Sequence, residues 1–145
     1  MTTATGHFTP GAEFTGASRT VTDAEISFLP ALMGAISPLF HDDVSARASA
    51  MGGRILYGPA LLGISVALTE PLLRDRVRGL VEITSVKFRR PVFAGDTVTA
   101  RFTVRDCQPR DGKPGMLLNV EDEVRNQDDE VVLRFARTVL IAHND

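Results

Sequence analysis

Apolar and polar residues alternate strictly in the C-terminal half of the chain. Every second residue from 98 to 104 is apolar and its neighbours are polar, which is the period of a strand with one buried face. A similar alternation recurs over 118–124 and 131–142. With further candidate strands at 13–21 and 81–89, the pattern predicts a sheet of about five mostly antiparallel strands.

Helical signals lie between the first of these strands and the second. Thr22 and Glu25 have the spacing of a capping box, which predicts a helix of roughly ten residues that begins there. The small residues and the proline of 34–40 predict a loop. A short helix is expected at 44–50, with Asp42 or its neighbour as the N-cap.

The segment 58–68 is apolar on nearly every side, which predicts a helix that is buried on most faces. Pro59 suits the first turn, where a missing N–H costs nothing, and the charged residues of 71–79 are expected to mark an exposed end. One buried helix and about five antiparallel strands predict an α+β fold, in which the sheet wraps around the helix. Residues 1–12 are expected to be a flexible N-terminus before a single domain at 13–145.

Composition narrows the possible functions. The chain has 145 residues, is 43% hydrophobic and carries a net charge of −2. It therefore has enough residues for one sizeable core, and it has no overall attraction to nucleic acid or to an anionic membrane. Its only cysteine, Cys107, cannot form a disulfide within the chain, which favours a reducing, cytoplasmic compartment. The first residues have neither the basic stretch nor the apolar core of a secretory signal.

Two motifs stand out from this background. The first is GAISPLFHD at 34–42 followed by GGRILYG at 52–58, and the second is FRRPVFAGDTV at 88–98. Both, in this order and spacing, resemble motifs of the MaoC-like hot-dog family, which includes (R)-specific enoyl-CoA hydratases and dehydratases. The resemblance covers roughly 21–142. It implies a hot-dog fold and an acyl thioester as the ligand.

The resemblance also shows where this chain departs from the family. The catalytic aspartate of the family falls on Ala35 and its catalytic histidine falls on Phe40, while Ser37 and Tyr57 replace an asparagine and a second histidine. Neither a methyl group nor a phenyl ring can exchange a proton, and the loss of a general acid–base costs about 10²- to 10⁴-fold in rate. Efficient hydration by the family's mechanism is therefore not expected.

Gly58 is the strongest candidate for a functional residue. In the family this glycine begins the central helix, and its N–H holds the thioester carbonyl. A helix N-terminus offers free N–H donors and a partial positive charge, which stabilise an enolate-like oxygen. The alternative is that Gly58 and Pro59 are simply a favourable helix start.

Three further residues are candidates for the missing proton carrier: His41, Asp42 and Tyr57. Because imidazole titrates near neutral pH, His41 could act as a base that the adjacent aspartate orients, or it could be an exposed loop histidine. Asp42 matches the second aspartate of the family, although capping a helix is the simpler role. The Tyr57 phenol could donate to a carbonyl, or its ring could seal the start of the helix.

Other residues are candidates for ligand binding. Ser37 could bind a ligand or a water, although a local Ser-Pro turn explains it too, and Phe40 stands at a ligand-facing position of the family's motif. Arg54, Arg89 and Arg90 could bind the phosphates of coenzyme A, or they could be solvated surface residues. The three histidines show no metal-ligand spacing. We therefore expect no metal and no cofactor, with an acyl-CoA or acyl-carrier thioester as the possible substrate.

Three functions fit these observations. The first is a divergent hydratase or dehydratase, a lyase that acts on an acyl thioester or on a specialised biosynthetic intermediate. The second is a non-catalytic acyl-binding subunit that pairs with an active MaoC-like partner. The third, a hot-dog thioesterase, is weakened because no carboxylate lies within 54–62. Because hot-dog domains commonly pair through their sheets and so cover exposed strand edges, we expect a homodimer or a heterodimer.

Overall fold

The computed structural model of the chain describes residues 7–143. It contains five strands: β1 (Glu13–Thr20), β2 (Val77–Phe88), β3 (Thr97–Pro109), β4 (Met116–Arg125) and β5 (Val131–Ile141). They form one sheet in the order β1-β3-β4-β5-β2, and every neighbouring pair is antiparallel. The prediction of a five-stranded antiparallel sheet is confirmed.

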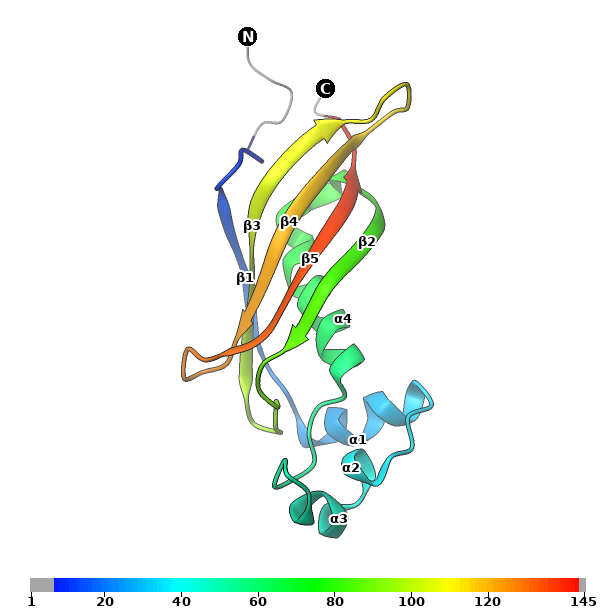
Figure 1. The fold of residues 1–145 in the computed structure, drawn as a ribbon, viewed down its shortest axis with the longest axis vertical. Coiled ribbons are helices and arrows are strands. Elements are labelled where there is room, and N and C mark those ends of the chain that lie inside the picture. The colour runs from blue at the N-terminus through cyan, green and yellow to red at the C-terminus, as the bar shows by residue number, and fades with distance from the viewer. Residues whose placement is uncertain (1–6, 144–145) are drawn as a thin grey trace.

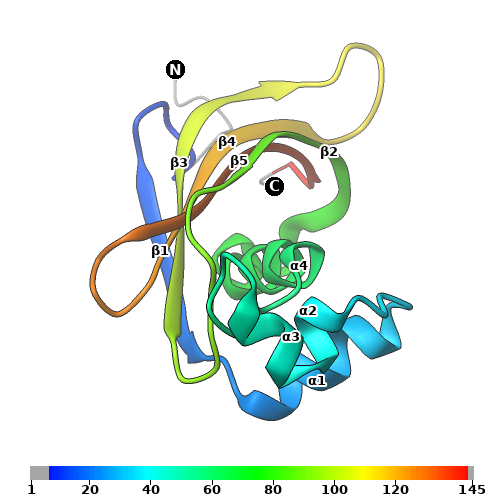
Figure 2. The ribbon, with the colours of Figure 1, turned by 60° about the horizontal axis from the view of Figure 1, so that its bottom comes forward.

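The sheet curls around a central helix, α4 (Gly58–Thr69), which lies along its concave face (Figure 1). Three short helices gather beside the N-terminal end of α4 (Figure 2). Leu61 and Ile64 of α4 are buried against the sheet, as the apolar sequence of this helix requires. A sheet wrapped around a buried helix is a hot-dog fold, so the predicted α+β architecture is confirmed.

The alternation along the strands determines what the core contains. The apolar residues of β3 point inward, and Val98 and Phe102 are almost fully buried. Two apolar clusters fill the space under the sheet, one that includes Leu61 and Leu133 and another that includes Phe102 and Leu118. Each cluster is continuous, because inward-facing side chains of neighbouring strands lie side by side.

A buried ion pair lies at the boundary between these two clusters. Arg137 Nε donates to Asp122 Oδ2 over 2.9 Å, and Arg137 Nη2 donates to the Thr69 hydroxyl over 2.6 Å. Asp122 and Arg137 are only 3% and 4% exposed. Because Thr69 is the last residue of α4, the pair joins the sheet to the end of the central helix.

The segment before β1 is packed against the fold. The Phe8 ring is buried, packs against Phe14 with 5.4 Å between ring centroids, and has the Arg76 guanidinium 5.2 Å from its centroid. The expectation of a flexible N-terminus over residues 1–12 is therefore wrong from Phe8 onward. Its first part, residues 1–6, lies outside the described residues.

The predicted helix starts are largely confirmed. α1 (Asp23–Leu32) begins with the expected capping box, in which Glu25 N–H donates to the Thr22 hydroxyl and Thr22 N–H donates to the Glu25 carboxylate. α3 (Asp43–Ala48) corresponds to the short helix expected at 44–50.

The predicted loop at 34–40 is wrong in its second half, which contains α2 (Pro38–His41). The Ser37 hydroxyl accepts from Leu39 N–H over 3.4 Å, and Pro38 occupies the first helical position. A serine N-cap followed by proline favours a helical turn, so the same residues that suggested a loop begin a helix.

The segment after α4 also differs from the prediction of an exposed charged end at 71–79. It forms a 3-10 helix, η1 (Glu70–Arg76), in which Leu73 is buried, and β2 begins directly after it. The apolar residues among the charged ones anchor this segment to the second core cluster.

β2 lies at one edge of the sheet and pairs only with β5 among the described strands. Eight of its 12 residues pair with residues of β5 between 133 and 141, and the register shifts three times along the strand. It exposes a row of large apolar side chains: Leu80, Val81, Val86 and Phe88. β2 is therefore an edge whose side chains are unusually apolar for contact with water.

Candidate functional site

The start of α4 lines a pocket of about 200 Å³, which we call the Gly58 pocket. Gly58, the first residue of the helix, and Leu61, one turn later, form one side of it. The other sides come from the segment before α4, from the end of β2 and from the loop after β2: Met51, Ile55, Leu56, Phe88, Arg89, Arg90, Pro91 and Val92. The pocket is therefore mainly apolar, and two arginine residues border it.

Backbone hydrogen bonds hold the walls of the Gly58 pocket. Leu56 N–H donates to the Val92 carbonyl over 2.7 Å, which fixes the segment before α4 against the loop after β2. Arg89 N–H donates to the Val132 carbonyl over 2.8 Å, which fixes the end of β2 to β5.

The first residue of α4 offers a backbone donor beside this pocket. The Gly58 N–H has no acceptor inside its own helix because it occupies the first helical position, and Pro59 has no N–H at all. Leu61 N–H, in contrast, donates to the Tyr57 carbonyl over 3.0 Å. The helix end also carries a partial positive charge. Gly58 can therefore hold a polarised oxygen in mainly apolar surroundings, where such an interaction is stronger than in water.

Phe40 and Tyr57 meet beside this helix start. Their ring centroids lie 5.2 Å apart, and their planes make an angle of 70°. Tyr57 directly precedes Gly58 and also packs against the first core cluster. The contact brings α2 to the start of α4, so three of the predicted site residues, Phe40, Tyr57 and Gly58, lie close together.

His41 lies on α2 and is exposed. Its Nε2 is 2.8 Å from the carbonyl oxygen of Ala35. Because a carbonyl oxygen can only accept, Nε2 carries the proton of this hydrogen bond, and the Nδ1 of a neutral ring is left as the acceptor. His41 is not among the residues that line the Gly58 pocket.

Ser37 and Asp42 act as helix caps. Asp42 accepts from the N–H groups of Val44 and Ser45 at 2.9 and 3.1 Å, and from the Ser45 hydroxyl at 2.7 Å. The hydrogen bond from the Ser45 hydroxyl, together with those from the backbone, lowers the pKa of Asp42. An ionised carboxylate with these partners is suited to capping and poorly suited to carrying a proton.

Arg54 is committed to neighbouring helices. Its guanidinium donates to Asp43 over 2.7 Å, to Asp23 over 3.0 Å and to the Ser27 hydroxyl over 2.6 Å. These bonds join α1 to α3, and the side chain is only 15% exposed. Of the three arginines that the sequence suggested for phosphate binding, only Arg89 and Arg90 line the Gly58 pocket.

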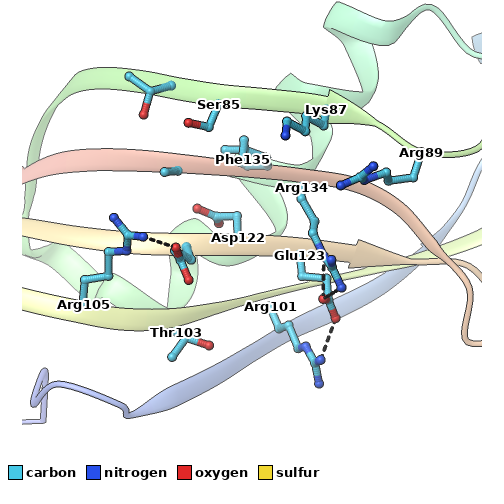
Figure 3. Close-up of a pocket in the computed structure, with 13 residues that line it drawn as sticks. Ser85, Lys87, Arg89, Arg101, Thr103, Arg105, Asp122, Glu123, Arg134 and Phe135 are labelled. Carbon is cyan, nitrogen blue, oxygen red and sulfur yellow. Dashed lines mark hydrogen bonds and ion pairs between the residues drawn. The ribbon is translucent and has the colours of Figure 1, made fainter.

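A larger groove of about 490 Å³ lies on the outer face of the sheet, away from α4 (Figure 3). Glu123 accepts from Arg101 over 2.6 Å and from Arg134 over 2.8 Å. Arg105 likewise forms an ion pair with Glu121. Paired charges of this kind are the usual covering of a solvated sheet face, so we place the candidate site in the Gly58 pocket.

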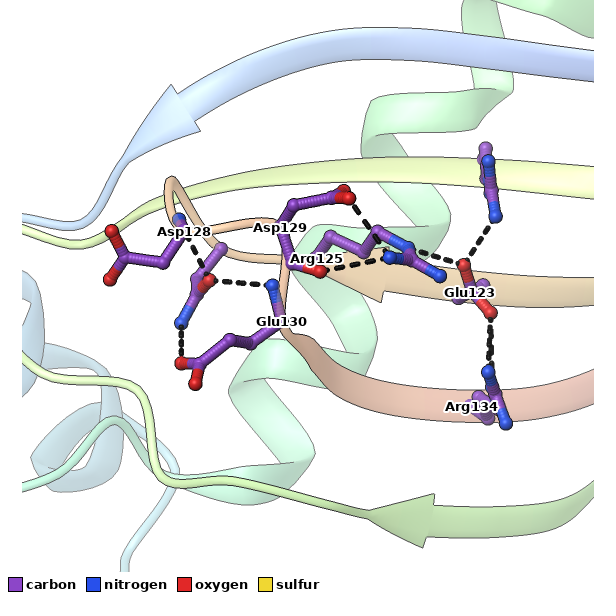
Figure 4. A network of polar contacts seen from close by, with 8 residues as sticks. Glu123, Arg125, Asp128, Asp129, Glu130 and Arg134 are labelled. Atoms are coloured by element: carbon purple, nitrogen blue, oxygen red, sulfur yellow. Dashed lines mark hydrogen bonds and ion pairs between the residues drawn. The ribbon is translucent and has the colours of Figure 1, made fainter.

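Glu123 is the centre of the polar network on this face (Figure 4). Arg125 donates to it over 2.7 Å and also pairs with Asp129 in the turn between β4 and β5. Partial burial alone would raise the pKa of Glu123, but hydrogen bonds from Arg125, Arg134 and Arg101 lower it to about 2. The carboxylate therefore stays ionised, and its role is to join three strands.

Phe88 is the site residue that sequence reasoning missed. It begins the motif at 88–98, which by itself indicates only the fold. A Cβ atom built on Gly58 would lie 3.1 Å from Phe88 Cζ, so the ring covers the start of α4. The spacing of apolar residues along β2 gives no sign of this contact.

Two absences hold for residues 7–143. No helix in this part of the chain is both long and apolar enough to cross a membrane. The same residues contain no group of three or more histidine, cysteine, aspartate or glutamate side chains that could hold a metal ion.

Residues 7–126 match the family model described as a MaoC like domain. Because the match covers most of the 145 residues, the chain belongs to the MaoC-like family. No curated protein matches the chain.

Solved structures with the same fold include a monoamine oxidase regulatory protein from Archaeoglobus. It is 29% identical over 94% of this chain and 92% of its own, with a TM-score of 0.86. The (R)-hydratase of A. caviae involved in PHA biosynthesis is 24% identical over 92% of this chain and 97% of its own, with a TM-score of 0.74. A protein of Mycobacterium tuberculosis with a double hot-dog fold is 20% identical over 94% of this chain but only 43% of its own, with a TM-score of 0.81. The fold of this chain thus corresponds to about half of that longer protein.

Proposed function

We propose that the protein is a divergent MaoC-like hydratase or dehydratase that binds an acyl thioester with its carbonyl oxygen at the Gly58 N–H. The observation that carries this proposal is the Gly58 pocket, where a helix N-terminus meets apolar walls and two arginines. The chain belongs to the MaoC-like family and has an (R)-hydratase among its structural neighbours.

Adding water to an enoyl thioester, or removing it, passes through a state in which the thioester carbonyl becomes enolate-like. Negative charge then develops on the carbonyl oxygen. A backbone N–H held at a helix N-terminus stabilises this charge without reorganisation, and one donor of this kind contributes about 10²- to 10³-fold in rate. Gly58 has this role in the proposal because its N–H has no partner within α4.

Arg89 and Arg90 suit the phosphates of the thioester's carrier, whether coenzyme A or the phosphopantetheine of a carrier protein. Both line the Gly58 pocket, and both also border a wider groove with Glu130 and Arg134. Arg90 lies 3.5 Å from the Glu130 carboxylate, a loose ion pair that a phosphate can replace.

The proton carrier in this proposal is His41 or Tyr57. Nδ1 of a neutral His41 can accept a proton, since Nε2 is engaged by the Ala35 carbonyl. The Tyr57 phenol belongs to the residue next to Gly58. Asp42 is the weakest of the three candidates, because both of its carboxylate oxygens already cap α3.

The alternative is a non-catalytic acyl-binding subunit, and one observation favours it. The resemblance implies a catalytic histidine at Phe40, and in this chain the Phe40 ring packs on Tyr57. Such a subunit would form a heterodimer with an active MaoC-like partner. The exposed apolar side chains of β2 suit pairing with a second domain in either case.

The test measures binding and turnover separately. Calorimetry with a non-reactive acyl-CoA thioether measures binding, and the loss of enoyl absorbance with an enoyl-CoA measures hydration. The same assay, followed with a thiol reagent, detects the hydrolysis expected of a thioesterase. Binding with hydration supports the enzyme, and binding without any turnover supports the subunit. Absence of binding, or equal binding by Gly58→Val that remains folded, refutes the placement of the carbonyl at Gly58.

A further inference from the structure

The end of β2 changes the face of the sheet to which its side chains point. Thr84 pairs with Ala136 of β5, and the next pair is Lys87 with Arg134. Two residues of β2, Ser85 and Val86, therefore stand opposite a single residue of β5. This is a β-bulge, which adds one residue to a strand and reverses the alternation beyond it.

The backbone confirms the position of this bulge. Ser85 has a φ of 55°, in the left-handed region that residues other than glycine rarely adopt. Such a conformation costs about 1–3 kcal/mol and persists where the surrounding structure requires it. The bulge is therefore a maintained feature of β2.

The consequence of the bulge falls on Phe88. Without the extra residue, Phe88 would share the face of Thr84, which is the outer face of the sheet. With it, Phe88 pairs with Leu133, a fully buried residue of the inner face. The ring is thereby placed against Gly58, where a built Cβ atom would lie 3.1 and 3.2 Å from Cζ and Cε1.

Phe88 is also half exposed, with 50% of its surface accessible. One part of the ring covers the first residue of α4, and another part faces the outside. Because Gly58 and Phe88 also line the same pocket, a group bound there meets this ring.

We propose that Phe88 determines which acyl groups can reach the Gly58 N–H, and that the bulge at Ser85 and Val86 exists to aim its ring there. The inference rests on the proposed function, since it assigns a thioester carbonyl to Gly58. In this proposal the α-carbon, which is bonded directly to the carbonyl carbon, lies on the Phe88 side of Gly58. The ring thus selects thioesters that are unbranched at this carbon over those that carry a methyl group on it.

The experiment compares two acyl-CoA thioether analogues, one unbranched and one with a methyl group at the α-carbon, by calorimetry. We expect the wild type to prefer the unbranched analogue by roughly tenfold, the usual discrimination for one methyl group in a packed site. Phe88→Ala should bring the ratio of the affinities for the two analogues close to one. Val86→Ala is the matched control, because Val86 is also an exposed apolar residue of β2 but does not line the pocket.

A second measurement tests the contact without any ligand. The change in the urea midpoint caused by Gly58→Ala should be more favourable in the Phe88→Ala background than in the wild type, because the new methyl group meets the Phe88 ring. Equal changes with and without Phe88 would show that the ring does not cover Gly58, and would overturn the inference.

The outcomes separate this inference from the proposed function. If the wild type binds neither analogue, the proposed function is wrong, and so is the role of Phe88 in selecting acyl groups. If the wild type binds the analogues and Phe88→Ala leaves their ratio unchanged, only the role of Phe88 is wrong. A ratio that shifts equally in Val86→Ala, together with a changed sedimentation coefficient, would assign Phe88 to a subunit contact instead.

Discussion

The rings of Phe40 and Tyr57 stand edge to face at the start of α4, with their centroids 5.2 Å apart. The resemblance to the MaoC-like family places a catalytic histidine at Phe40. In this chain an apolar contact occupies that position, while the spacing to Gly58 is kept. We therefore expect the surrounding backbone to present a dyad if the two side chains are supplied.

The first prediction follows from this geometry. Ala35→Asp combined with Phe40→His should raise the hydration of a simple enoyl-CoA by about 10²-fold, the usual contribution of a general acid–base pair. The loss of the aromatic contact with Tyr57 should lower the stability by about 1 kcal/mol. Initial rates and urea unfolding of the same preparation measure both effects.

His41→Ala in the wild-type background is the control. If His41 only donates to the Ala35 carbonyl, this change leaves any native hydration intact. If the wild type is already a fast hydratase and His41→Ala abolishes the activity, the base has moved by one residue along α2 and the interpretation of a missing dyad is wrong.

The second prediction separates two arginines that looked alike in the sequence. Arg54→Ala should lower stability by about 1 kcal/mol, because it breaks the ion pairs with Asp23 and Asp43. It should leave the affinity for coenzyme A unchanged. Arg89→Ala should weaken coenzyme A binding and leave stability nearly unchanged. The prediction fails if calorimetry shows the larger loss of affinity for Arg54→Ala.

The different contacts of Arg54 and Arg89 could not be predicted from the sequence. The alternation over β3 and the apolar α4 were sufficient to predict the fold, since burial follows directly from periodicity. The partners of Arg54 lie 31 and 11 residues away, and pairing over such distances is decided by how α1 and α3 pack. A list of basic residues cannot supply that information.

The buried Asp122–Arg137 pair is a different case, because the alternation of apolar residues in the sequence indicates it. Asp122 occupies one of the alternating inward positions of β4, between Val120 and Val124. Arg137 occupies one of the alternating inward positions of β5. Two opposite charges at inward positions of neighbouring strands indicate an internal ion pair. The bulge that turns Phe88 inward had no comparable signal, since Ser85 and Val86 are ordinary strand residues.

The third prediction concerns assembly. We expect the protein to form a dimer through the β2 edge, at its exposed apolar residues Leu80 and Val81. Val81→Lys should shift the protein to the monomer in sedimentation at micromolar concentration, because a charge in an apolar interface is costly. Thr103→Lys on the outer face of the sheet is the matched control. A wild type that sediments as a monomer, with no partner recovered from its source, would contradict the prediction.

The last prediction concerns the Asp122–Arg137 pair and its pH dependence. Burial raises the pKa of Asp122 from its ordinary 3.8 to about 6, although Arg137 acts to lower it. The folded protein therefore binds this proton more tightly than the unfolded chain does. The contribution of Asp122 to stability grows as pH falls from about 6 to 3.8, by up to about 3 kcal/mol. It is lost again as pH rises through about 6.

The contribution of Glu123 to stability depends on pH in the opposite direction and changes over a lower pH range. Its pKa is lowered from 4.5 to about 2, so its contribution is present above pH 4.5 and is lost as the pH falls towards 2. The interval from pH 6.5 to 4.5 therefore reports mainly on Asp122. Glu123→Gln should change the slope of stability against pH only below this interval.

Replacing both members of the pair tests the assignment. At pH 7.5, Arg137→Met alone should lower the free energy of unfolding by about 3–5 kcal/mol, because it leaves a buried charge without its partner. This loss of stability should be smaller at pH 5, because Asp122 can take up a proton there. Asp122→Leu with Arg137→Met should cost less than the sum of the single changes, and should flatten the dependence of stability on pH between 6.5 and 4.5. Urea unfolding at a series of pH values measures all three variants. If the double variant keeps the wild-type slope in that interval, Asp122 is not the group that titrates there.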